Sequence, residues 1–204
     1  MKERPISFSP PMVMAIQENL KTMTRRTRGL KEINQDPDAW RFIRTEEGIY
    51  SFLHKDGGKK SIFCPYGIPG DRLWVKEALI RKTNRSRSMA FYATDDEPVL
   101  IGGSGIDDVL KWKWERDYLP ATFMPRFAGR YLLEEISIRT ERLQRITPCD
   151  CMKEGLRTFM RGSGACSDLL VQFESLWNRI NFKKYPWKSN IHVWVIEFKR
   201  SVRE

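Results

Sequence analysis

The sequence predicts a mixed α+β protein that folds as a single domain over residues 1–204. Two observations carry this prediction. Several short segments alternate apolar and polar residues, which is typical of strands with one buried face. Three other segments begin with residues that favour helix starts, and apolar residues recur at helical spacing in the first and the last of them. A chain of this length buries enough surface to form one hydrophobic core.

The net charge of +10 favours an anionic partner, most often a nucleic acid. No apolar run is long enough to cross a bilayer, and the start Met-Lys-Glu-Arg-Pro lacks the apolar core of a signal peptide. The four cysteines do not form a disulfide-scaffold pattern, which favours a reducing compartment. We therefore predict a cytoplasmic protein with no membrane partner.

The first predicted helix begins at Ser9-Pro10, where serine caps the helix and proline occupies its first position. It leads directly into the cationic stretch Lys21–Arg26 (sequence KTMTRR), in which Thr22 and Thr24 favour an extended backbone. The cluster therefore lies where a helix is followed by a strand. On local chemistry alone, a solvated basic edge is favoured over a binding site, because runs of charge are usually solvated.

Residues 27–61 show weaker periodicity, and the segments 40–43 and 49–53 within them predict a hairpin beside the core. The loop Cys64–Asp71 is rich in proline and glycine and leads into a strand at 72–78. On that strand Glu77 shares the apolar face, an unusual place for a carboxylate.

A basic turn at 81–87 and a strand at 89–93 follow. The segment 111–116 then alternates cations with Trp112 and Trp114. A groove that stacks bases and holds phosphates needs that mixture. A strand with its aromatic face in the core has the same pattern, so both interpretations stay open. Lys183 and Lys184 lie in a second loop that mixes basic and aromatic residues.

The remaining segments predict a long strand at 129–143, a helix beginning at Thr147-Pro148, a helix opening at Ser167 and a central strand at 191–198. Gly155 ends the short helix and leaves Glu154 as its last residue. A carboxylate there faces the negative end of the helix dipole, so it is placed against its local preference.

The residues that carry chemistry exclude several classes of site. The chain has two histidines, His54 and His192, and no Cys-x-x-Cys pair, so we expect no metal. Phosphate-loop and dinucleotide glycine patterns are absent, and we expect no cofactor. Lysine, threonine and glutamate remain as the plausible reactive set, in which a desolvated lysine removes the proton of a threonine hydroxyl.

Four segments resemble the ASCH domain in order and spacing. They are the motif Lys21-Thr22-x-Thr24-x-Arg26, the stretch Gly70–Val75, the segment 143–155 and the closing segment 194–198. The loop 64–71 is similar to one in phage and prophage ASCH proteins. The resemblance implies a PUA-like fold, a small, mostly antiparallel β-barrel with packed helices and long loop or hairpin insertions, here at 27–61 and 94–122. It also implies a cleft where the first helix meets the strands.

The resemblance implies binding of RNA or a modified nucleoside. One small bacterial branch hydrolyses N4-acetylcytidine with a Lys, a Thr and a Glu, which correspond here to Lys21, Thr24 and Glu154. This chain differs from that branch in its length and in Asn19, which replaces a glycine. Alternatives are a non-catalytic binder of RNA, DNA or a modified base, and a metal-independent ribonuclease. The predicted binding residues are Thr22, Arg25, Arg26, Trp74, Glu77, Trp112, Trp114, Lys183 and Lys184.

Overall fold

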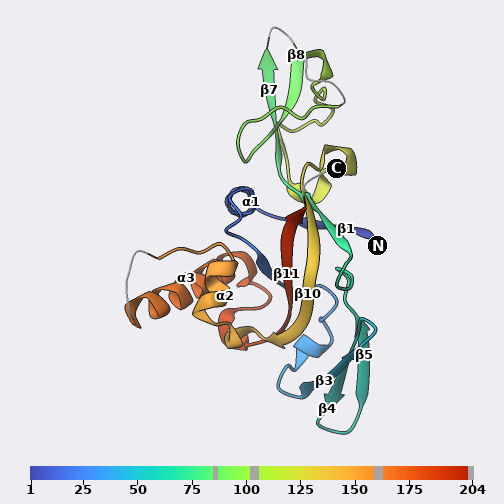
Figure 1. Ribbon diagram of the computed structural model, residues 1–204, viewed down its shortest axis with the longest axis vertical. Helices are drawn as coiled ribbons and strands as arrows, with labels where there is room; N and C mark the ends of the chain where they lie inside the picture. Colours follow the sequence, from blue (N-terminus) through green and yellow to red (C-terminus); the bar gives the residue numbers. More distant parts are fainter. Residues whose placement is uncertain (85–86, 102–105, 159–162, 202–204) are drawn as a thin grey trace.

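A central five-stranded sheet organises the computed structural model, which describes residues 1–84, 87–101, 106–158 and 163–201 (Figure 1). The strand order is β1-β6-β10-β11-β2, and the β1–β6 pair is parallel while the other pairs are antiparallel. The bounds are Glu3–Ser7 for β1, Arg72–Lys76 for β6, Leu132–Arg142 for β10, His192–Ser201 for β11 and Met23–Arg26 for β2. Within these residues no strand pairing joins β1 to β2, so the sheet has two edges.

The sheet is buried on both faces because β11 alternates between two hydrophobic clusters. Trp194, Ile196 and Phe198 pack into one cluster together with α1 (Pro10–Gln17), whereas Val193 and Val195 pack into the other. This two-sided burial explains why the strand has no polar face, and it confirms the predicted central position of the last strand.

Two small sheets lie at opposite ends of the molecule in Figure 1. One contains β3 (Trp40–Glu46), β4 (Ile49–His54) and β5 (Lys59–Phe63), which confirms the predicted hairpin. The other contains β7 (Leu79–Asn84), β8 (Arg87–Tyr92) and β9 (Tyr118–Leu119). The predicted basic turn at 81–87 is therefore wrong for residues 81–84, which continue β7, and residues 85–86 lie outside the described part.

The helices begin and end near the predicted positions. α2 (Pro148–Lys153) has the expected capping box, in which the Thr147 side chain accepts from the Asp150 amide and Asp150 accepts from the Thr147 amide. α3 (Ser163–Asn181) begins before the predicted Ser167. Ser9 has the extended conformation of an N-cap before α1, although its side chain makes no capping bond. Of the helices described, none is long and apolar enough to cross a membrane.

The helices α2 and α3 pack against each other, and their apolar side chains meet those of β2 and β11 in one cluster. Met23 of β2 belongs to this cluster together with Phe173 and Trp177 of α3. The edge strand β2 therefore lies between α1 on one side and the α2–α3 pair on the other. Both predicted functional motifs, residues 21–26 and the end of α2, meet at this place.

Candidate functional site

Lys21 reaches the site because the chain turns sharply after α1. Asn19 adopts a left-handed conformation (φ 57°), and the Lys21 amide donates back to the carbonyl of Ala15. The backbone then runs beside the end of α2, with Lys21 bridged to Glu154. Gly155 (φ +93°) allows this approach, because a Cβ there would lie 3.1 Å from the Ala15 Cβ and 3.3 Å from the Lys21 Cβ.

Lys21 and Glu154 form a buried ion pair. The Lys21 Nζ donates to the Glu154 Oε2 at 2.6 Å and to the Glu154 carbonyl oxygen at 2.8 Å. Burial lowers the pKa of Lys21, and the Glu154 carboxylate opposes that shift. The carboxylate that the sequence placed against the helix dipole is thus stabilised by a cation from another element.

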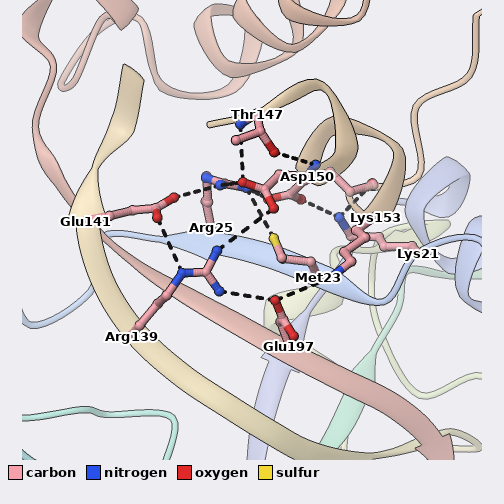
Figure 2. Close-up of polar contacts among 10 residues, drawn as sticks. Lys21, Met23, Arg25, Arg139, Glu141, Thr147, Asp150, Lys153 and Glu197 are labelled. Carbon is pink, nitrogen blue, oxygen red and sulfur yellow. Dashed lines mark hydrogen bonds and ion pairs between the residues drawn. The ribbon is translucent and has the colours of Figure 1, made fainter. Parts of the chain in front are cut away.

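Arg25 joins Glu154 to two more carboxylates, those of Glu141 and Asp150, which Figure 2 labels beside Arg25. Its Nη2 lies 2.7 Å from Glu141 Oε1 and 2.9 Å from Asp150 Oδ2, and its Nη1 lies 3.3 Å from Glu154 Oε1. Burial acts to lower the pKa of Arg25, but the three carboxylates outweigh it and raise that pKa. Asp150 has a lowered pKa because the Thr147 amide and Arg25 together outweigh its own burial.

Arg139 and Lys153 extend this arrangement to Glu197. The Arg139 guanidinium lies 3.3 Å from Glu141 Oε2 and 3.1 Å from Glu197 Oε1, and the Lys153 Nζ lies 3.6 Å from Glu197 Oε1 (Figure 2). Cations and carboxylates are therefore matched in number across this group, which we call the Arg25 cluster. Its members are Lys21, Arg25, Arg139, Lys153, Glu141, Asp150, Glu154 and Glu197.

A cavity of about 400 Å³ lies along β2, between the end of α2 and one face of α3. We call it the β2 cavity. Its wall combines a hydroxyl, a carboxylate, several cations and aromatic rings. The lining residues with polar, charged or aromatic side chains include Thr24, Arg25, Arg26, Arg28, Tyr66, Glu154, Phe173, Trp177 and Lys184.

Five of the predicted site residues line the β2 cavity, namely Thr24, Arg25, Arg26, Glu154 and Lys184. Lys21 lies behind the wall, where it holds Glu154. Thr22 and Lys183 are not part of the lining, although they are sequence neighbours of residues close to it. Residues 24–26 of the first motif and Glu154 of the segment 143–155 thus line one cavity, whereas no residue of the closing segment 194–198 is part of its lining.

Glu77 and Trp74 lie away from this cavity. Glu77 is fully buried and accepts two hydrogen bonds of 2.8 Å from Arg130 and one of 2.9 Å from Thr94. Trp74 is buried, with Lys76 and Arg126 over its ring. Its ring also faces Gly129, where a Cβ would approach it to 3.0 Å. Both side chains are occupied by structural contacts.

Trp112 and Trp114 also lie elsewhere, on the small β7–β9 sheet. Their rings are 4.9 Å apart in an edge-to-face pair, and both pack against the hydrophobic cluster of that sheet. Residues 112–116 are not a strand, and Lys111 makes only an isolated bridge to Met89. The structure thus supports the packing interpretation in part, because the rings are only partly buried.

Several residues of the site were not identified from the sequence. Tyr66 and Arg28 line the cavity, and Glu141 and Asp150 bind Arg25. Trp177 belongs to the apolar stripe of α3, which the sequence assigned wholly to the core. Tyr66 could have been found from its place in the rigid 64–71 loop, but nothing near Glu141 in the sequence indicates its partner.

No protein-family model, curated protein or solved structure matches this chain. In the described residues no group of three or more His, Cys, Asp or Glu side chains is arranged to hold a metal ion.

Proposed function

We propose that the β2 cavity binds a nucleoside, either free or as a unit of RNA, in a domain of the ASCH type with a PUA-like fold. The supporting observation is the composition of the cavity wall, which includes the rings of Tyr66 and Trp177 as well as Thr24 and Glu154. Unpaired nucleobases bind by stacking on rings and by hydrogen bonds at their polar edges. The cavity volume is within the usual range for small-ligand sites.

The reaction that we propose is hydrolysis of an N4-acylcytidine-type amide. The Thr24 hydroxyl attacks the acyl carbon and its proton passes to Lys21, which returns it to the departing exocyclic amine as the C–N bond breaks. Water then hydrolyses the acyl ester on Thr24. Glu154 orients Lys21 through the two short bonds described above. The burial that lowers the pKa of Lys21 favours the neutral amine that this step requires.

One observation favours binding without hydrolysis as the second candidate function. Lys21 directs its ammonium group to Glu154 twice, and no hydrogen bond between Lys21 and Thr24 occurs among the contacts of the described chain. In this candidate the Lys21–Glu154 pair fixes the cavity wall and the ligand is only held.

Release of cytidine from N4-acetylcytidine, followed by chromatography, tests the reaction. We expect Thr24→Val to reduce the rate by at least ~100-fold, because the nucleophile is lost while the shape is kept. Thr140→Val is the matched control, since Thr140 is buried in the same sheet and its hydroxyl has no partner in the described residues. It should keep the rate within about twofold.

The other results separate the candidates. Binding of N4-acetylcytidine by the wild type without turnover would identify the non-catalytic function. Cleavage of labelled RNA in the presence of a chelator would identify the metal-independent ribonuclease. Absence of both nucleoside and RNA binding would overturn the proposed function.

A further inference from the structure

Arg26 carries a partly buried guanidinium group that forms no ion pair with a carboxylate in the described residues. Its Nη2 donates to the Ser7 carbonyl at 2.7 Å, and its guanidinium carbon lies 4.8 Å from the centroid of the Phe8 ring. Its Nε is buried and unpaired, and no ion pair to Arg26 occurs in the described residues. Burial lowers its pKa, although an arginine stays charged at neutral pH.

An unpaired buried cation costs free energy that an anion can recover. Taking an ion partly out of water is unfavourable, and one carbonyl and one ring offset only part of that cost. Arg25 shows the compensated case, because three carboxylates bind it. Glu154 acts on Arg26 only from beyond ion-pair distance, and Arg26 lines the β2 cavity, so a ligand can supply the direct counter-charge.

Two further cations lie at the same cavity. Arg28 and Lys184 are exposed and line it, and neither forms an ion pair within the part of the chain that the structure describes. Glu154 is the sole carboxylate among the lining residues, and Lys21 and Arg25 already bind it. The cavity therefore has an excess of positive charge at its Arg26 and Arg28 wall.

We propose that Arg26 forms a phosphate-binding subsite of the β2 cavity, so that the ligand is a phosphorylated nucleoside. Arginine binds phosphate through two parallel N–H donors, a geometry suited to a dianion or a diester. The phosphate comes either from a free mononucleotide or from the backbone of an RNA strand. This inference rests on the proposed function for the nucleoside part of the ligand, whereas the anion subsite is independent of it.

Calorimetric titration with cytidine, cytidine 5′-monophosphate and inorganic phosphate tests the subsite. We expect the wild type to bind the monophosphate at least ~tenfold more tightly than cytidine. In Arg26→Gln the two affinities should lie within about twofold of each other. Arg44→Gln is the matched control, because Arg44 is exposed on β3, outside the cavity, and should keep the wild-type difference.

The outcomes for subsite and function are distinguishable. Equal affinity of the wild type for cytidine and its monophosphate overturns the phosphate subsite and leaves the nucleoside function in place. Binding of inorganic phosphate that Arg26→Gln abolishes, with no binding of either cytidine compound, supports the subsite and overturns the nucleoside function. If Arg26→Gln does not fold, Arg26→Lys replaces it, since loss of the two-donor geometry should reduce the monophosphate preference.

A short cytidine oligonucleotide distinguishes the two sources of phosphate. Binding much tighter than that of the monophosphate, and lost in Arg26→Gln, assigns the subsite to a strand backbone. Equal binding of the two assigns it to a mononucleotide.

Discussion

Arg25 and Arg26 are neighbours on one strand, yet they lie in opposite electrostatic surroundings. Alternation along β2 directs Arg25 toward the ring of Phe173 in α3 and Arg26 toward the ring of Phe8. Arg25 meets three carboxylates, whereas Arg26 meets a backbone carbonyl and a ring. Arg25 is therefore part of the fold, whereas Arg26 is available to a ligand.

Replacement of each arginine by methionine gives the largest expected effect. Arg25→Met leaves Glu141, Asp150 and Glu154 without their shared cation, so we expect it to lower the free energy of unfolding by about 3–5 kcal/mol. Arg26→Met removes a charge that has no ion-pair partner, so it should change the free energy of unfolding by less than about 1 kcal/mol. Urea unfolding of the two variants measures the difference, and equal losses would contradict the distinction between the two residues.

Glu135 extends the comparison to a buried charge that can be neutralised by protonation. It is 2% exposed, and neither carboxyl oxygen has a partner in the described residues. Burial and the nearby Asp71 raise its pKa to about 8, while Arg4 opposes the shift. Gly67 (φ +126°) packs close to both acids, since a Cβ there would lie 2.8 Å from Asp71 Oδ2 and 3.1 Å from Glu135 Oε1.

The folded state therefore keeps a proton on Glu135 that the unfolded state releases above its ordinary pKa of 4.5. The contribution of Glu135 to the free energy of unfolding therefore falls as the pH rises from about 4.5 to 8, and it is constant above that range. We expect the free energy of unfolding of the wild type to fall by about 3 kcal/mol between pH 6 and pH 9 because of this group, and Glu135→Gln to lack that fall. Urea unfolding at both pH values measures it, and an unchanged pH dependence in the variant would contradict this assignment.

Added phosphate should have the smallest effect on stability, and it tests directly whether Arg26 binds an anion. A ligand that binds only the folded state at ten times its dissociation constant stabilises it by about 1.4 kcal/mol. We expect inorganic phosphate to raise the melting temperature of the wild type but not that of Arg26→Met, with chloride at equal ionic strength as the control. A similar rise in both proteins would place the phosphate elsewhere.

Local signals in the sequence located much of the fold correctly. Thr147, Pro148 and Asp150 form the predicted helix start, because a capping box depends on residues only three apart. The last strand has no turn residue, which predicted its central position in the sheet. The segment 111–116 was ambiguous because packed tryptophans and base-stacking tryptophans have the same pattern.

The candidate site was only partly predictable. The sequence selected Lys21, Thr24 and Glu154 through a motif resemblance, and the placement of Glu154 against the helix dipole gave independent support. The PUA-like barrel remains a prediction, since the described strands form a sheet with two edges. Glu77 looked equally unusual on its strand, yet Arg130 occupies it in a buried pair far from the cavity. An unusual position of a carboxylate in the sequence therefore does not by itself identify a residue of the site.

The sequence was sufficient to place two adjacent arginines on a strand after a helix, and to end a short capped helix within one residue of Glu154, which is the C-cap of α2. Which arginine is neutralised depends on contacts that form only in the folded chain. The carboxylates of Glu141, Asp150 and Glu154 lie more than a hundred positions from Arg25 along the chain, and chain folding brings them to one side of β2. Because successive side chains of a strand point to opposite faces, Arg26 points away from Arg25. The lack of an acid paired with Arg26 depends on which elements pack against that face of β2.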